Sequence, residues 1–280
     1  MIGIGLICAF ACALAKAVDV LINKAVMENQ SAVQHSLLRI IFVTPVLMIA
    51  ALLHWKLEKG VLGYVLLYGI LEAVNIFCHQ TAVKRSEPLH IELISKSKIF
   101  FVLIVSFVVG IDRLTPARTL GIAIFMAGTV LTVNFQDKSN RDRTDFMGIA
   151  LETVSVLART FKPFVLKSCV RQGLATNETM AFLSMFVAFA ILAAAFRPRL
   201  NFKTVSVKKY LGQAVIVGLG MLLGGWSVIY ANTVIVNAIE GTTVFFVMGL
   251  SWLLLKKKYN WLTMVGCLIA VAGIVLSIVL

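Results

Sequence analysis

Charged residues are scarce in this chain: only 14% of its 280 residues are Asp, Glu, Lys or Arg, whereas 60% are hydrophobic and the mean hydropathy is +0.94. A soluble domain of this size could not bury so much apolar surface, and long apolar stretches recur along the whole sequence. The composition therefore excludes an ordinary soluble protein. It indicates an integral membrane protein built of many spanning helices.

Acidic residues are especially few, with 13 Asp and Glu against 26 Lys and Arg, so the formal net charge is +13. Such a surplus of positive charge can indicate a nucleic-acid partner. Here, however, most basic residues lie in short connectors between apolar runs, a placement that is typical of membrane topology signals. The sequence therefore predicts that these residues meet the lipid bilayer and bind no nucleic acid.

The motifs of membrane enzymes, channels and metal proteins are also missing from the sequence. It contains no Walker loop, no HExxH and no Ser/His/Asp set near a membrane surface, and no span repeats a filter-like sequence. The five cysteines lie inside or at the ends of apolar runs with no CxxC pair: Cys8, Cys12, Cys78, Cys169 and Cys267. We therefore predict no enzyme, no channel, no disulfide and no metal or other cofactor.

The apolar runs define the expected fold. About 20 residues cross a membrane as a helix, so a chain of this length holds about ten spans with short connections. Polar or turn residues separate the runs at 2–24, 33–53, 61–83, 88–110, 116–134, 147–168, 176–196, 210–230, 233–255 and 260–280. The break between the eighth and ninth runs carries no charge and is inferred from length alone. The predicted fold class is an all-α integral membrane protein of ten transmembrane helices.

The long polar connector 136–145 divides the chain into two similar halves, 1–135 and 146–280. With an offset of 145 residues, Gly121 and Gly128 of the fifth span fall on Gly266 and Gly273 of the tenth. Small residues at this spacing let helices approach closely in lipid, so we expect these two spans to be structural. Five spans per half give the second half the opposite orientation. The sequence therefore predicts two inverted five-helix repeats, an architecture typical of transporters that work by alternating access.

Ionisable residues inside the other spans fall on single helix faces, which is typical of helices that line one cavity. Charges within a bilayer are costly and usually mark a pathway or binding site. The segment 87–110 is the richest, because its first half is polar and its second half is apolar. The candidate substrate-binding residues are Lys16, Asp19, Arg39, Glu72, His79, Glu92, Lys96, Lys98, Arg159, Lys162, Tyr230, Asn237 and Glu240.

Several of these charged residues could have either a structural partner inside the protein or a substrate as their partner. Lys16 and Asp19 are three residues apart and could pair with each other. Arg39 is alone in its helix, and a structural carboxylate or a substrate is an equally good partner. Arg159 and Lys162 repel each other unless an anion or two carboxylates lie beside them.

Both signs of charge inside the spans suit an anion or a zwitterion and fit poorly with a hydrophobic cation. Basic side chains bind phosphate and carboxylate groups well, so we expect negative charge to be held by Arg159, Lys162, Lys96 and Lys98. An ammonium group or a proton would be held by Asp19, Glu72 and Glu240. Glu240 is the most isolated carboxylate by sequence, and with Glu72 it is a candidate for proton coupling.

The predicted function is therefore secondary active transport of a small polar metabolite by alternating access, coupled to protons or to exchange. The substrate would be an amino acid, a phosphorylated compound or a nucleotide-like compound. An alternative is a broad exporter of amphipathic compounds, in which the charges pair internally and the aromatic side chains of Trp226, Tyr230 and Phe164 select the substrate. A lipid-headgroup flippase is another. We expect a monomer or homodimer in a bacterial inner membrane.

Two segments resemble the end of a repeat in EamA-type members of the drug/metabolite transporter superfamily: VVGIDRLTPARTLGIAIFMAGTVL and LLLKKKYNWLTMVGCLIAVAGIVL. In that family an apolar span leads through a short turn to a helix with paired glycines. The family's usual proline early in the fourth and ninth spans is replaced here by Lys98 and Thr243. The resemblance implies a ten-helix bundle of two inverted repeats around a central cavity. It also implies cytoplasmic termini, whereas the excess of basic residues after odd-numbered spans places the termini outside.

Overall fold

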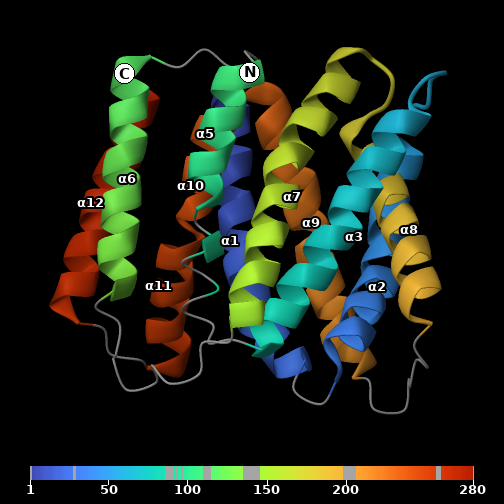
Figure 1. Ribbon diagram of the computed structural model, residues 1–280, viewed down its shortest axis with the longest axis horizontal. Helices are drawn as coiled ribbons and strands as arrows, with labels where there is room; N and C mark the ends of the chain where they lie inside the picture. The colour runs from blue at the N-terminus through green and yellow to red at the C-terminus, as the bar shows by residue number, and fades with distance from the viewer. Residues whose placement is uncertain are drawn as a thin grey trace.

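The computed structural model describes residues 2–27, 30–85, 91, 94–95, 97–109, 115–134, 146–197, 206–256 and 260–279. Helices are the regular elements of these residues (Figure 1). In chain order they are α1 (Ile2–Met27), α2 (Ala32–Leu53), α3 (Leu62–Arg85), α5 (Lys98–Val109), α6 (Pro116–Asn134), α7 (Phe146–Arg171), α8 (Asn177–Phe196), α9 (Val207–Tyr230), α10 (Thr233–Gly241), α11 (Thr243–Leu255) and α12 (Trp261–Val279).

The all-helical fold class is confirmed, and the predicted spans agree with the helices to within about three residues at the ends that can be compared. Two spans differ from a single continuous helix. The ninth is made of α10 and α11, and α5 forms the second half of the fourth. Six helices of the described chain are long and apolar enough to cross a membrane by length and composition. A total of ten crossings stays a prediction.

The distribution of side chains is the reverse of that in a soluble protein. Large apolar side chains such as Phe107, Phe146 and Leu268 are exposed on the outside of the bundle. Polar side chains such as His35 and Glu152 are fully buried inside it. A bilayer favours this arrangement, because lipid offers no hydrogen bonds to polar groups whereas it solvates apolar ones.

Helices of the first half pack mainly on helices of the second half. The closest pairs are α6 with α12, α1 with α9, and α3 with α7, and α8 packs on both α3 and α2. The pair of α6 and α12 stands at one edge of the bundle, and both ends of the chain lie at the same end of it (Figure 1). The remaining helices surround the interior that holds the charged residues.

The glycines of α6 and α12 permit a backbone contact between these helices, which agrees with the structural role that their spacing predicted. A Cβ atom on Gly128 would lie 2.4 Å from the backbone nitrogen of Ala270, and one on Gly273 would lie 2.4 Å from that of Phe125. Because 128 and 273, like 125 and 270, differ by 145, the two contacts are equivalent. No side chain fits at either position unless the helices move apart.

Substituting Gly273 with alanine is therefore expected to lower the midpoint of thermal unfolding in detergent. Overpacking against a neighbouring backbone costs about 1–3 kcal/mol, more than the gain in helix propensity of about 1 kcal/mol. Gly212→Ala in α9 is the matched control, since a Cβ there meets nothing within 4 Å. An unchanged midpoint for Gly273→Ala would show that the two helices are not in backbone contact.

The uncharged break between α9 and α10 has a local cause. The side chain of Asn232 accepts hydrogen bonds from the backbone N–H groups of Val234 (2.9 Å) and Ile235 (3.3 Å), so it caps the start of α10. Asparagine is among the best N-cap residues because its side chain satisfies amides that have no partner in the helix. Asn232 therefore marks the start of α10, although this break was inferred from the length of the apolar run alone.

The interruption between α10 and α11 positions Glu240 at the end of a half-helix. Thr242 and Thr243 donate their hydroxyls to the carbonyl oxygens of Ile239 and Glu240, each at 2.6 Å. These hydroxyls satisfy carbonyl groups at the end of α10. Non-helical backbone at membrane depth is tolerated when its polar groups find such partners inside the protein.

Candidate functional site

A cavity of about 300 Å³ lies inside the bundle, between α1, α2, α3, α5, α7, α9 and α10. The structure brings most of the predicted binding residues to this one space. Its lining includes Lys16, Asp19, Arg39, Glu72, His79, Lys98, Arg159, Lys162, Asn237 and Glu240. Glu92 and Lys96 lie outside the described residues.

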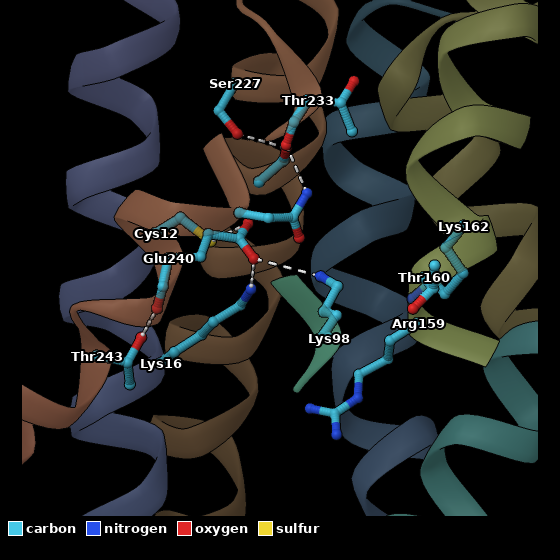
Figure 2. A network of polar contacts seen from close by, with 12 residues as sticks. Cys12, Lys16, Lys98, Arg159, Thr160, Lys162, Ser227, Thr233, Glu240 and Thr243 are labelled. Carbon is cyan, nitrogen blue, oxygen red and sulfur yellow. Dashed lines mark hydrogen bonds and ion pairs between the residues drawn. The ribbon is translucent and has the colours of Figure 1, made fainter. Parts of the chain in front are cut away.

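Glu240 is the meeting point of two lysines (Figure 2). The Nζ atom of Lys16 lies 2.6 Å from Glu240 Oε2, and that of Lys98 lies 3.7 Å from the same oxygen. The other carboxylate oxygen accepts a weak hydrogen bond from the Cys12 thiol at 3.5 Å. Glu240 is thus a shared counter-ion of α1 and α5, and the prediction that it is isolated is wrong. The sequence could not show this because Lys16 is 224 residues away.

Lys162 on α7 pairs with Glu72 on α3. Its ammonium also lies over the ring of Tyr68, 5.1 Å from the ring centroid, where the negative face of the aromatic ring attracts a cation. Pro163 follows Lys162 within α7 and also lines the cavity. This pair forms one wall of the cavity.

Arg159, one turn before Lys162, pairs with Glu152 on its own helix. It also donates a hydrogen bond to Ser95 Oγ at 3.0 Å. The second oxygen of Glu152 lies 2.8 Å from His79 Nδ1 on α3, and Glu152 is fully buried. The sequence left open whether an anion or two carboxylates balance the neighbouring cations Arg159 and Lys162. In the structure two carboxylates, Glu152 and Glu72, lie beside them.

Asp19 and Arg39 form the next ion pair, with Arg39 Nη2 lying 2.6 Å from Asp19 Oδ2. Gln213 on α9 donates to the other oxygen of Asp19 at 2.9 Å. Asp19 therefore pairs with α2 and not with Lys16. The alternative of an i,i+3 pair within α1 is therefore wrong, because Lys16 and Asp19 each pair with a residue of another helix.

A buried polar network continues from this pair away from the cavity. His35, one turn before Arg39 on α2, lies 2.8 Å from Asn23 Oδ1 and 2.8 Å from the hydroxyl of Tyr210. Tyr210 also bonds to Gln30. The prediction that Arg39 is alone in its helix is therefore wrong. The four-residue spacing of His35 and Arg39, which puts both on one helix face, was the signal that could have found it.

The aromatic residues named for an exporter lie elsewhere. Tyr230 is 41% exposed at the end of α9, Phe164 is packed in an apolar core cluster, and Trp226 donates to Glu178 Oε1 at 3.0 Å. None of the three is among the described residues that line the cavity. The aromatic ring found there is that of Tyr68, which had no distinguishing charge or spacing in the sequence.

Asn237 lines the cavity one turn before Glu240 on α10 and is only 3% exposed. Its amide nitrogen donates to the carbonyl oxygen of Thr233 at 2.7 Å. Its side-chain oxygen is buried and has no hydrogen-bond partner among the residues that the structure describes. A buried acceptor of this kind is costly unless a ligand or water donates to it.

Metal binding has no support in the described part of the chain, where no group of three or more His, Cys, Asp and Glu side chains could hold an ion. The chemistry that the cavity offers is ionic and hydrogen-bonding. It consists of ammonium and guanidinium groups, carboxylates, an amide and hydroxyls, set into a wall that is apolar elsewhere. Groups of these kinds can bind and orient a small polar solute.

A comparison with protein families identifies the chain. The model of the EamA-like transporter family matches it twice, over residues 3–134 and 146–279. The chain therefore belongs to the EamA-like transporter family. As an EamA-type member of the drug/metabolite transporter superfamily, it is an integral membrane transporter with two copies of the family's repeat.

Solved structures share the fold of this EamA-like transporter. One, described only as "Crystal structure of protein", has 16% sequence identity and a TM-score of 0.75 over 98% of this chain and 98% of that chain. At this identity the likeness shows the fold alone. No protein with a curated description matches the sequence.

Proposed function

We propose that this EamA-like transporter is a secondary carrier of a small anionic or zwitterionic metabolite, which binds in the charged cavity. The observation that carries the proposal is the balance of charge there. Among the described residues, three cations each have a carboxylate of their own, in the pairs Arg39–Asp19, Lys162–Glu72 and Arg159–Glu152. Lys16 and Lys98 share Glu240. These five cations and four carboxylates of the described residues thus leave a surplus of one positive charge, which favours an anion.

Alternating access is proposed to arise from two inverted repeats, 1–135 and 146–280. Three features support this arrangement. The family model matches each half once. In Figure 1, α1 runs from the end that carries the N mark toward the opposite end, whereas α7 runs the other way. Lys98 and Thr243, 145 residues apart, are the first residues of α5 and α11, so the two half-helices begin at equivalent positions.

The small cavity favours a metabolite over a broad range of amphipathic drugs. Pockets for drug-sized ligands have volumes of about 300–1,000 Å³ and walls rich in aromatic residues. This cavity, at about 300 Å³, is at the lower limit and is lined by paired charges. An exporter of lipophilic cations would need unpaired acids and extensive aromatic surface, whereas the described lining offers no unpaired acid and one tyrosine ring, that of Tyr68, which already has Lys162 over it.

The experiment is a comparison of solutes on the full-length protein. Purified protein is reconstituted into liposomes, and entry of radiolabelled small carboxylates, amino acids and phosphate esters is compared with that of a lipophilic cation such as tetraphenylphosphonium. Saturable uptake of anions or zwitterions, competed by unlabelled solute, is expected. Transport of the lipophilic cation alone would overturn the proposal in favour of an exporter. Movement of a fluorescent phospholipid between leaflets, with no uptake of any of these solutes, would overturn it in favour of a flippase.

A further inference from the structure

Lys98 has an ammonium group that is available to a ligand. Among the described residues, its nearest carboxylate oxygen is Glu240 Oε2 at 3.7 Å, which is beyond hydrogen-bonding distance. The same oxygen is taken by Lys16 at 2.6 Å. The Lys98 side chain is 17% exposed and lines the cavity. Three N–H donors therefore face a polar cavity without a protein acceptor in the described part of the chain.

Net charge limits what such a donor can bind. Counted over the described lining residues together with Glu152, the partner of Arg159, one cation is in excess, so a solute of net charge −1 balances these residues. A zwitterion brings no net charge and leaves the excess, whereas a dianion replaces it with an excess of negative charge. Uncompensated charge in a largely buried site is costly. The cavity is therefore matched to a monoanion.

The buried side-chain oxygen of Asn237, which has no hydrogen-bond partner among the described residues, places a second requirement on the ligand. It is an acceptor, so it is satisfied by a solute that donates an O–H or N–H group. Asn237 and Glu240 are three residues apart on α10 and thus on the same helix face, and Glu240 is the residue beside Lys98. An anionic group at Lys98 and a donor at Asn237 therefore fall within one small ligand.

We infer that the cavity is a binding site for a small hydroxycarboxylate, with the carboxylate held by Lys98 and a hydroxyl group donating to the side-chain oxygen of Asn237. This inference rests on the proposed function and names the class of its substrate. A carboxylate fits better than a phosphate ester, because phosphate monoesters carry about −1.5 to −2 charges at neutral pH. A hydroxyl fits better than an ammonium group, because an ammonium would restore the excess positive charge.

The test measures binding of matched probes to the full-length protein in detergent, by isothermal titration and by the shift of the thermal midpoint. Lactate and gluconate carry both groups, whereas propionate and hexanoate lack the hydroxyls. Alanine is the zwitterion and malonate the dianion. We expect at least one hydroxylated acid to bind about tenfold or more tightly than its partner without hydroxyls, because that partner leaves the Asn237 oxygen unpaired.

Two variants assign the groups. Lys98→Met is expected to weaken binding of the hydroxylated acid about tenfold or more, while leaving Glu240 paired with Lys16. In the absence of ligand its thermal midpoint should be unchanged or higher, because the excess charge is gone. Asn237→Leu should bring the affinities of the hydroxylated and plain acids together. Lys56→Met, in the loop after α2 and outside the described lining of the cavity, is the control and should bind as the parent does.

The outcomes separate this inference from the proposed function. Equal binding of acids with and without hydroxyls, or tightest binding of alanine or malonate, overturns the hydroxycarboxylate and leaves a carrier of anions or zwitterions. Undiminished binding to Lys98→Met overturns the assignment of the carboxylate. Saturable transport of lipophilic cations, with no binding of any of these probes, overturns both.

Discussion

Replacing Glu240 with glutamine is expected to reduce uptake of monoanions strongly, because it leaves Lys16 and Lys98 without their common carboxylate. Breaking a buried pair by removing one partner costs about 3–5 kcal/mol. The cost here is at the lower end or below it, since the Lys16 side chain is 45% exposed and is screened by water. The excess charge of the described lining rises by one. Uptake of a monoanion should fall about tenfold or more, while a dianion such as malonate should bind more tightly than to the parent.

Uptake into proteoliposomes and thermal-shift measurements on the same preparation check this result. Glu178→Gln is the matched control: Glu178 is also a buried carboxylate, but it accepts a hydrogen bond from Trp226 and is not part of the described cavity lining. Glutamine keeps an oxygen for that bond. If Glu240→Gln transported monoanions like the parent, the shared ion pair would have no part in binding.

Replacing Lys162 with methionine is expected to destabilise the protein by about 3–5 kcal/mol, because Glu72 would be left buried without a counter-charge. Glu72 is only 5% exposed, and the Lys162 side chain is 15% exposed, so water screens the pair weakly. Adding Glu72→Gln to Lys162→Met should recover most of the loss. A buried pair can be replaced as a whole at little cost, whereas half of it cannot.

The midpoint of thermal unfolding in detergent, followed by size-exclusion chromatography after heating, measures this pair of variants. The difference between the double variant and the sum of the single ones gives the coupling of the two side chains. Lys208→Met, at the exposed start of α9, is the control for loss of a lysine and should leave the midpoint unchanged. A double variant as unstable as Lys162→Met would mean that packing of the lysine stem, and not its charge, stabilises α7 against α3.

Ion pairs in the interior join neighbouring helices, so a rearrangement of these helices during transport would affect the pairs. Lys162–Glu72 joins α7 to α3, Arg39–Asp19 joins α2 to α1, and Lys16–Glu240 joins α1 to α10. Any motion that separates these helices must break or exchange such pairs. A substrate anion that competes with Glu240 for a lysine would lower the cost of that exchange, so binding and rearrangement would be linked.

Local features of the sequence were enough to predict the helices. Apolar runs of sufficient length between polar connectors place their ends to within about three residues, because a bilayer imposes a minimum length and excludes unpaired backbone. The glycines at 121, 128, 266 and 273 predicted that the fifth and tenth spans are structural helices suited to close packing, but not that they pack on each other. The division of the ninth span at Thr242 was not predicted, although glycine and two threonines lie there, because such small residues also occur within continuous membrane helices.

Helical periodicity also placed the ionisable residues on shared faces, and the residues of those faces line one cavity. The ion-pair partners of these residues, however, could not be predicted from the sequence. Lys16 pairs with a carboxylate 224 residues away and Lys162 with one 90 residues away, while the near neighbour Asp19 pairs with Arg39. The period of a helix determines which residues point the same way, but packing determines what they point at. The sequence by itself determined that this protein is a bundle of membrane helices with charges inside, and only the tertiary structure decided that Lys16 and Lys98 share one carboxylate.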